Sequence, residues 1–261
     1  MTEQSNNSPA NPRHLGIGTW ISIGNPVITE LASEFSFDWL LFDLEHGYLQ
    51  ESSLVSNFQA AGGKDIRLIV RAPSLNPALI ARILDWGASG IMMPHVANAE
   101  QALACIKAMR YPPLGQRGYS GSARSFTFGL KGQQNQNKSA MPILMVQIEN
   151  TEGVKNAEEI AGVEGVDVLF VGPSDLKLEL DTNSNANAVS YKESLQIVCR
   201  AAQKYRKQAG ILVHDPGSLE ELIPYGFTCF AISSELGVIV KGYQGIISKT
   251  SELMNKLMFV L

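Results

Sequence analysis

Cysteine is scarce in this chain. Only Cys105, Cys199 and Cys229 occur among its 261 residues, and no two of them form a CxxC pair. An odd number of widely spaced cysteines argues against a disulfide framework and against a structural zinc site. We therefore expect three reduced cysteines that pack as small apolar side chains, as is usual in a cytoplasmic protein.

Long apolar runs and clusters of basic residues are also missing. No apolar stretch approaches the roughly 18 residues that indicate a transmembrane helix, so we expect no membrane partner. The 21 basic residues are spread among 25 acidic ones, and no basic stripe indicates binding to nucleic acid. Residues 1–14 are polar and lack the hydrophobic core of an export signal. We expect them to form a disordered leader on a cytoplasmic protein.

The rest of the chain, residues 15–261, repeats one pattern. Short apolar runs rich in β-branched and aromatic residues alternate with segments of helical period. Runs that are continuously rather than alternately apolar are typical of parallel strands buried on both faces. The predicted strands are Leu15–Trp20, Trp39–Leu44, Arg67–Val70, Gly90–Pro94, Ile143–Ile148, Val166–Val171, Gly210–Val213 and Cys229–Ile232. The predicted helices are Pro26–Phe35, Pro77–Trp86, Glu100–Arg110, Glu152–Ala161, Tyr191–Gln208 and Glu235–Met258.

This alternation over the whole length predicts a single α/β domain, a (β/α)8 barrel of the TIM type. A doubly wound open sheet is the alternative, but no GxGxxG motif follows the first strand to support a dinucleotide-binding fold. The connection from Arg110 to Met141 breaks the pattern, and loops of that length are usually functional or mobile. Its second half, rich in Gln, Asn and Lys, is typical of a flexible surface turn.

Polar residues follow the predicted strands at their carboxyl ends, where barrel enzymes carry their chemistry. Each has an ordinary alternative as a cap, an ion pair or a solvated rim residue, but together they would line one mouth. These residues are Asp43, Glu45, His46, Arg71, His95, Gln147, Glu149, Ser174, Asp175, His214 and Asp215.

Glu149 and Asp175 follow neighbouring strands and have no adjacent cysteine. Two such carboxylates suit a hard divalent cation such as Mg²⁺ or Mn²⁺. The alternative is an ion pair or, for Asp175, a helix cap. Arg71 is either an ion-pair partner or a fork for an anionic or enolate oxygen. His46 is either a satisfied core histidine or a general base.

Several segments together resemble one known family. They are FDWLLFDLEHG, the strand ending at Arg71, ILDWGASGIMMPHV, RYPPLGQRG, VQIENTEGVKN and GVDVLFVGPSDL. In order and spacing they resemble the HpcH/HpaI aldolases, metal-dependent class II pyruvate aldolases, from about Gly16 to about Gly242. The resemblance implies a modified (β/α)8 barrel and a homohexamer, a trimer of dimers. It also implies that the long helix after Glu235 is swapped between subunits.

The resemblance implies a role for each polar residue of the mouth. His46 matches the catalytic base and Arg71 the enolate-stabilising arginine. Asp85 matches an aspartate that raises the basicity of the histidine, often across a subunit boundary. Glu149 and Asp175 match the ligands of Mg²⁺, or of Mn²⁺ or Co²⁺ in its place. The residues that match substrate contacts are Arg71, Gln147, Gly172, Pro173 and Ser174.

The activity implied by this resemblance is retro-aldol cleavage of a 4-hydroxy-2-oxo acid to pyruvate and an aldehyde. Substrates of the family are 2-keto-3-deoxy sugar acids and 4-hydroxy-2-oxoheptanedioate. No predicted strand contains a lysine for a Schiff base, which agrees with a metal-dependent lyase. One alternative is an enolate-based synthase or transferase that joins oxaloacetate or pyruvate to an electrophile such as a thioester. A non-catalytic binder of small acids is the other.

Some positions depart from the family pattern. His95 and His214 stand at strand ends where we expect apolar or small residues. We interpret them either as neutral variation or as a change in specificity, with an added contact to a carboxylate. Ser233, Ser234 and Glu235 replace a usual Gly/Ser-Asp pair. The acceptor aldehyde therefore stays open.

Overall fold

Eight parallel strands close into a barrel in the computed structural model, which describes residues 13–130, 141–182 and 189–258. The strands are β1 (Ile17–Ile21), β2 (Trp39–Asp43), β3 (Arg67–Arg71), β4 (Gly90–Met93), β5 (Ile143–Ile148), β6 (Val168–Val171), β7 (Gln208–Val213) and β8 (Phe227–Ser234). Each strand pairs with the next, and β8 closes the ring by pairing with β1. The predicted (β/α)8 barrel is confirmed.

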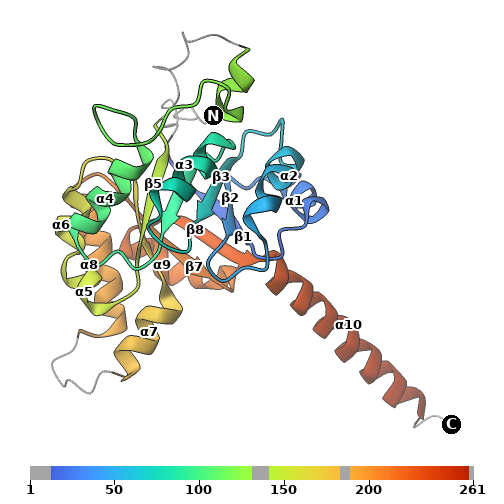
Figure 1. Ribbon diagram of the computed structural model, residues 1–261. Coiled ribbons are helices and arrows are strands. Elements are labelled where there is room, and N and C mark those ends of the chain that lie inside the picture. Colours follow the sequence, from blue (N-terminus) through green and yellow to red (C-terminus); the bar gives the residue numbers. More distant parts are fainter. Residues whose placement is uncertain (1–12, 131–140, 183–188, 259–261) are drawn as a thin grey trace, which may run out of the picture.

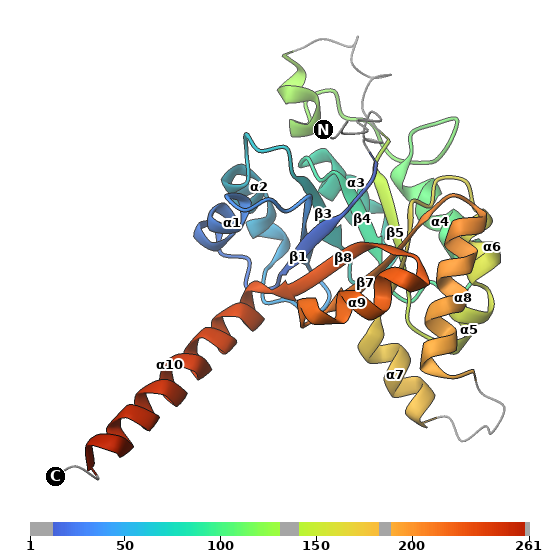
Figure 2. The same ribbon diagram turned by 180° about the vertical axis from the view of Figure 1, so that it is seen from behind.

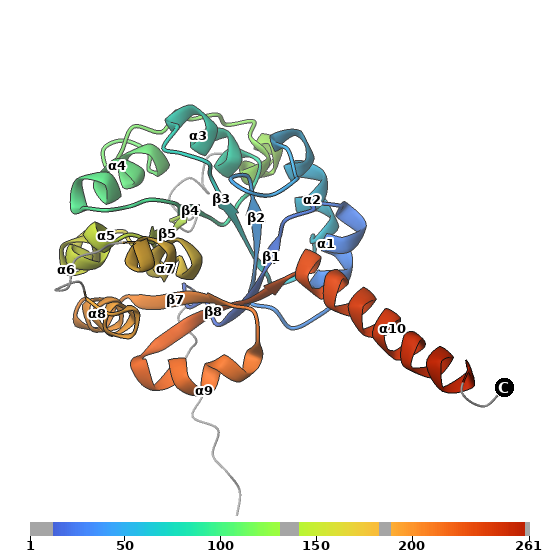
Figure 3. The same ribbon diagram turned by 90° about the horizontal axis from the view of Figure 1, so that it is seen from below.

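Helices surround the barrel, and one more extends from it, as three views show (Figure 1, Figure 2 and Figure 3). The surrounding helices are α1 (Pro26–Ser33), α2 (Leu54–Ala60), α3 (Pro77–Asp85), α4 (Ala99–Met109), α5 (Thr151–Lys155), α6 (Ala157–Gly162), α7 (Pro173–Thr182), α8 (Tyr191–Lys204) and α9 (Leu219–Leu222). The helix that extends from the barrel is α10 (Glu235–Met258). A short 3-10 segment, η2 (Arg124–Gly129), lies in the long connection between α4 and β5. Within the described part of the chain, no helix combines the length and apolar character needed to cross a membrane.

Several of these helices follow a strand closely and have an asparagine as their N-cap residue. The side-chain oxygens of Asn25, Asn76, Asn98 and Asn150 accept hydrogen bonds from backbone N–H groups of the first turn. These bonds satisfy donors that the start of a helix leaves without a partner. In α1 and α3 a proline also fills the first helical position. Both helices therefore begin at the predicted residue.

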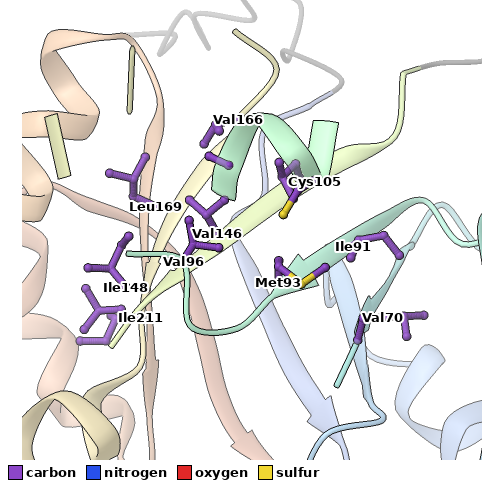
Figure 4. Packing of buried hydrophobic residues seen from close by; sticks show 14 of the residues in the cluster. Val70, Ile91, Met93, Val96, Cys105, Val146, Ile148, Val166, Leu169 and Ile211 are labelled. Atoms are coloured by element: carbon purple, nitrogen blue, oxygen red, sulfur yellow. The ribbon is translucent and has the colours of Figure 1, made fainter. Parts of the chain in front are cut away.

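Side chains on the strands alternate between the barrel interior and the helix layer. Trp20, Trp39 and Phe170 belong to the inner cluster, where the Phe170 ring centroid lies 5.8 Å from that of Trp20. Val146 of β5 and Cys105 of α4 belong to the outer cluster, which fills the space between strands and helices (Figure 4). The inner series of each strand leads directly to the mouth of the barrel.

The last helix, α10, projects away from the barrel (Figure 1). Its exposed apolar residues include Val238, Tyr243, Ile246, Ile247 and Leu253. On the barrel, Val27 and Leu31 of α1 and the following Phe35 are also exposed. Apolar stripes of this kind mark interaction surfaces. The predicted span of α10 is confirmed, whereas its swap between subunits stays a prediction.

The structure differs from the predicted elements in a few places. The helix predicted over Glu152–Ala161 is two helices, α5 and α6, because Asn156 between them departs from helical geometry. The helix predicted over Tyr191–Gln208 ends at Lys204, and Gln208 opens β7. The short helices α2 and α9 were not predicted, because four to seven residues do not establish a helical period.

Two expectations fall partly outside the described residues. The second half of the long connection, residues 131–140, lies outside them, as do residues 1–12 of the expected leader. Arg13 is described, and its guanidinium donates hydrogen bonds of 2.7 and 2.5 Å to the Asp167 carboxylate. The final part of the expected leader is therefore attached to the base of β6.

Candidate active site

Polar side chains occupy the positions where the inner series of three strands reaches the mouth. The inner series ends in a polar side chain on β2, β3 and β5, after Leu41, Ile69 and Met145 of the apolar inner cluster; these end residues are Asp43, Arg71 and Gln147. All three are buried. A cavity of about 170 Å³ opens there, lined by Arg71, Gln147, His46 and the start of α7. The alternation of the strands therefore brings the predicted residues of different strands to one place.

Arg71 is held in a fixed orientation by two carboxylates. Its Nε and Nη2 donate to Asp43 Oδ1 and Oδ2 at 2.8 and 2.7 Å, and its Nη1 lies 3.0 Å from Glu45 Oε2. Burial lowers the pKa of Arg71, but Asp43 and Glu45 raise it more, so the guanidinium stays charged. A guanidinium has five N–H donors. Arg71 is thus an ion-pair partner with N–H groups left for an anionic ligand.

Asp43 also organises the turn that carries His46. Its Oδ1 accepts hydrogen bonds from the backbone N–H groups of Glu45 and His46 at 3.0 and 3.2 Å. Its Oδ2 accepts one from Trp20 Nε1 at 3.3 Å. Burial raises the pKa of Asp43, but the hydrogen bond and charge of Arg71 outweigh it and hold the pKa below its usual value. The His46 side chain, 69% exposed, projects from this fixed turn.

Glu149 lies just beyond β5 and is buried. Its Oε1 accepts a 2.6 Å hydrogen bond from the His95 backbone N–H, and its Oε2 accepts a 2.5 Å bond from Gln147 Nε2. Burial raises the pKa of Glu149, and the charges of Glu45 and Asp175 add to the rise. The contacts from His95 oppose this rise without cancelling it. Glu149 is therefore a carboxylate that a cation would stabilise.

The start of α7 forms another side of the cavity. Gly172 is buried, and α7 begins at Pro173, so the first turn of the helix faces the mouth. Ser174 and Asp175 line the cavity. Their N–H groups precede the first helical bond, which runs from Leu176 N–H to Gly172 O at 3.1 Å. Such N–H groups can donate to an anion.

The donors at the mouth fit a hard divalent cation. Glu149 and Asp175 supply carboxylates, and Gln147 Oε1 is buried without a hydrogen-bond partner. Across the described ranges, no three His, Cys, Asp or Glu side chains gather so as to hold a metal by themselves. Mg²⁺ does not need such a cluster, because it usually keeps waters and binds one or two carboxylates together with ligand oxygens. Glu149 and Asp175 are therefore candidate ligands.

Asp85 and His46 are not brought together within one chain. Asp85 ends α3 on the far side from the mouth, because that helix runs back towards the start of β4. There it accepts a 2.5 Å hydrogen bond from Arg117 Nη2. The predicted partnership with His46 would need a second subunit.

A larger cavity, of about 790 Å³, lies at the opposite face of the barrel. Its lining includes Ser89, Ile143 and Asp167, which stand at or just before the starts of β4, β5 and β6. Barrel enzymes carry their chemistry at the carboxyl ends of the strands. The smaller cavity at the mouth is therefore the candidate active site.

Sequence reasoning missed the apolar part of the site. Trp20, Phe170 and Leu212 line the mouth cavity, and the Trp20 ring centroid lies 5.3 Å from the centre of the Arg71 guanidinium. An apolar residue at the end of a strand looks like any other core residue in the sequence. The period of two along each strand was the available signal, because it places Phe170 on the inner face.

The residues that depart from the family pattern lie in different environments. His214 is exposed, and its backbone carbonyl accepts a 2.8 Å hydrogen bond from Lys241 Nζ. Glu235 is buried, and its Oε1 accepts a 2.6 Å bond from the Ile23 N–H, which ties α10 to the turn after β1. His95 contacts two carboxylates of the site.

A substitution at Gly172 tests how tightly the site is packed. A Cβ at this position would lie 2.7 Å from Glu149 Oε2 and 2.8 Å from Gln147 Nε2. We expect Gly172→Ala to displace the Glu149 carboxylate and to weaken Mn²⁺ binding about tenfold or more. Titration followed by electron paramagnetic resonance measures this. Gly118→Ala, where a Cβ meets nothing within 4 Å, is the matched control; equal affinities for both variants would contradict the expectation.

The closed barrel with ionisable groups at its mouth defines an enzyme of the (β/α)8 class. Residues 16–241 match the HpcH/HpaI aldolase/citrate lyase family. The 5-keto-4-deoxy-D-glucarate aldolase of Klebsiella pneumoniae subsp. pneumoniae is 38% identical over 226 residues, which cover 85% of this chain and 87% of that protein. The chain therefore belongs to the HpcH/HpaI aldolase/citrate lyase family. It is a carbon–carbon lyase of the aldolase type, as predicted.

Solved structures agree with this assignment. An HpcH/HpaI aldolase/citrate lyase family protein from Burkholderia cenocepacia has a TM-score of 0.84 at 26% identity, covering 92% of this chain and 95% of that one. The citrate synthase SbnG has a TM-score of 0.78 at 24% identity, covering 94% of this chain and 96% of that one. The second likeness shows a shared fold, which does not by itself define the reaction.

Proposed function

We propose that the enzyme cleaves a 2-keto-3-deoxy sugar acid, which is a 4-hydroxy-2-oxo acid, to pyruvate and an aldehyde. The observation that supports this most strongly is that Glu149, Asp175 and the charged Arg71 share one mouth. We further propose that Glu149 and Asp175 hold the cation, which is Mg²⁺, or Mn²⁺ or Co²⁺ in its place.

The residues of the mouth match the charges that develop in this reaction. Breaking the C3–C4 bond leaves its electron pair on the pyruvyl fragment as an enolate. The remaining N–H groups of Arg71 would donate to the enolate oxygen, and those of Ser174 and Asp175 would hold the substrate carboxylate. A bound divalent cation would act as a Lewis acid on the carboxylate and keto oxygens.

Proton transfer is assigned to His46. Its exposed imidazole would take the proton from the 4-hydroxyl as the aldehyde forms, and a proton delivered to C3 would complete pyruvate. Gln147, Gly172 and Pro173 would shape the pocket for the 2-oxo acid.

We infer that two subunits complete this site in a homohexamer built as a trimer of dimers. Within one chain Asp85 pairs with Arg117 and does not contact His46, so Asp85 of a neighbouring subunit would orient the imidazole. The exposed stripes of α10 and α1 would be covered when α10 is exchanged between subunits. The other partners are small molecules, a 2-oxo acid and an aldehyde, with no nucleic acid or membrane.

The oligomer can be tested on α10. We expect the double variant Ile246→Glu, Ile247→Glu to reduce the native hexamer to smaller species, because it places charges in an apolar interface. Light scattering after size-exclusion chromatography measures the mass. Lys249→Glu, at an exposed position of the same helix, should leave the mass unchanged. A double variant with the native mass would contradict the swap.

The activity is tested by pyruvate release coupled to lactate dehydrogenase. The panel contains 5-keto-4-deoxy-D-glucarate, 2-keto-3-deoxy sugar acids and 4-hydroxy-2-oxoheptanedioate, each with Mg²⁺ and with EDTA. We expect release that needs the metal and is fastest with a sugar acid. Absence of release from every acid, together with thiol release from a coenzyme A thioester and oxaloacetate, would replace the proposal with a synthase.

We place the enzyme in the cytoplasm. Cys105, Cys199 and Cys229 are buried and unbridged. Burial raises the pKa of Cys105 and of Cys199 to about 12, so these thiols stay protonated at neutral pH. Three reduced cysteines suit a reducing compartment. Fractionation of the source cells tests this assignment.

A further inference from the structure

His95 has no part in the chemistry described above, yet its backbone is unusual. It follows β4 with φ of 55°, in the left-handed region that residues with a side chain rarely adopt. Such conformations persist where the surrounding structure enforces them, and they are common at functional sites. The contacts of His95 show what this conformation achieves.

Two donors of His95 converge on a single oxygen of Glu149. The backbone N–H donates to Glu149 Oε1 at 2.6 Å, and Nδ1 lies 2.8 Å from the same oxygen. A ring nitrogen at this distance from a carboxylate acts as a donor. The left-handed backbone therefore directs the main chain and the side chain of one residue at the same atom.

The other side of the imidazole faces Glu45. His95 Nε2 lies 3.4 Å from Glu45 Oε1, and the second oxygen of Glu45 lies 3.0 Å from Arg71 Nη1. His95 thus bridges the carboxylate that holds Arg71 and the carboxylate assigned to the cation. The charge of Glu45 raises the pKa of Glu149, and the imidazole contacts both carboxylates.

We propose that His95 is a positioning residue that holds the Glu149 carboxylate for the cation and joins it, through Glu45, to Arg71. This rests on the proposed function in that Glu149 is taken as a ligand. The proposal gives His95 no place among the ligands, because both of its ring nitrogens face carboxylate oxygens. Within the described residues no third His, Cys, Asp or Glu joins Glu149 and Asp175 in a metal-holding group.

The substitution His95→Gly separates this role from the stability of the fold. Glycine accepts the left-handed conformation and keeps the backbone N–H, so only the imidazole is lost. We expect the dissociation constant for Mn²⁺ to rise about 10- to 100-fold, as when partners of metal ligands are removed. We also expect a melting temperature at or above the wild-type value. Isothermal titration with Mn²⁺ and thermal unfolding measure the two quantities.

Three further measurements complete the test. Free imidazole should restore part of the Mn²⁺ affinity of His95→Gly, which a merely structural role would not produce. His214→Gly removes the exposed histidine after β7 and should leave the affinity unchanged. Pulsed electron paramagnetic resonance of bound Mn²⁺ should show no directly coordinated nitrogen, and a nitrogen ligand that disappears in His95→Gly would overturn the positioning role.

The failure of this inference can be distinguished from that of the proposed function. If the wild type binds Mn²⁺, Glu149→Gln does not and His95→Gly binds as the wild type does, only the role of His95 is wrong. If the wild type and Glu149→Gln bind Mn²⁺ equally, the assignment of the ligands is wrong and the role of His95 falls with it.

Discussion

Glu149→Gln is expected to abolish metal-dependent pyruvate release and to leave the barrel folded. The substitution keeps the size of the side chain and one of its two accepting oxygens but removes its charge. A metal ion at a site of this kind supplies several kcal/mol of transition-state stabilisation, so the rate should fall by about a thousandfold or more. Steady-state kinetics with saturating Mg²⁺, together with the Mn²⁺ dissociation constant, measure the loss.

Glu152→Gln is the matched control for this variant. Glu152 lies in the first turn of α5, three residues after Glu149, and is exposed to solvent. It should retain the wild-type rate and affinity. A Glu149→Gln enzyme within tenfold of the wild-type rate would remove Glu149 from the metal site.

Arg71→Lys is expected to lower kcat by about a hundredfold or more, although the positive charge is kept. One ammonium group cannot reproduce the paired bonds to Asp43 and the contact to Glu45 and still donate to an enolate oxygen. The variant should also lose roughly 2 kcal/mol in the free energy of unfolding, because buried charge-assisted hydrogen bonds are removed. Urea denaturation and steady-state kinetics measure the two effects.

Arg82→Lys serves as the comparison for Arg71→Lys. Arg82 pairs with Glu51 on the surface, with 56% of its side chain exposed. Exposed ion pairs contribute about 0 to 1 kcal/mol, so this variant should be close to wild type in both measurements. An Arg71→Lys enzyme that matched Arg82→Lys would show that the fork at Arg71 is not needed.

Local chemistry made most of the fold predictable. Asparagine followed by proline marks the starts of α1 and α3, and mainly apolar runs located strands such as β5. The ends of some helices and strands were not predicted, because contacts with other elements determine where they lie. The helical pattern of α8 continues past Lys204, but Gln208 is drawn into the sheet by its place in β7.

Part of the site was predictable from two features of the strands: where each strand ends, and which of its alternate residues face the barrel interior. Arg71 and Gln147 follow from the inner series of β3 and β5, and Glu149 and Asp175 from their places after strands. Contacts between distant segments were not predictable. The pairing of Asp85 with Arg117 and the bridge made by His95 depend on backbone conformations that appear only in three dimensions.

The most direct test of the account is exchange of the pyruvate methyl protons with D₂O, followed by nuclear magnetic resonance. Exchange reports enolate formation at the mouth and needs no knowledge of the aldehyde. We predict rapid exchange with Mg²⁺, none with EDTA, and none in Glu149→Gln. Folded wild-type enzyme with bound Mg²⁺ and no exchange would contradict the assignment of this mouth as a pyruvate enolate site.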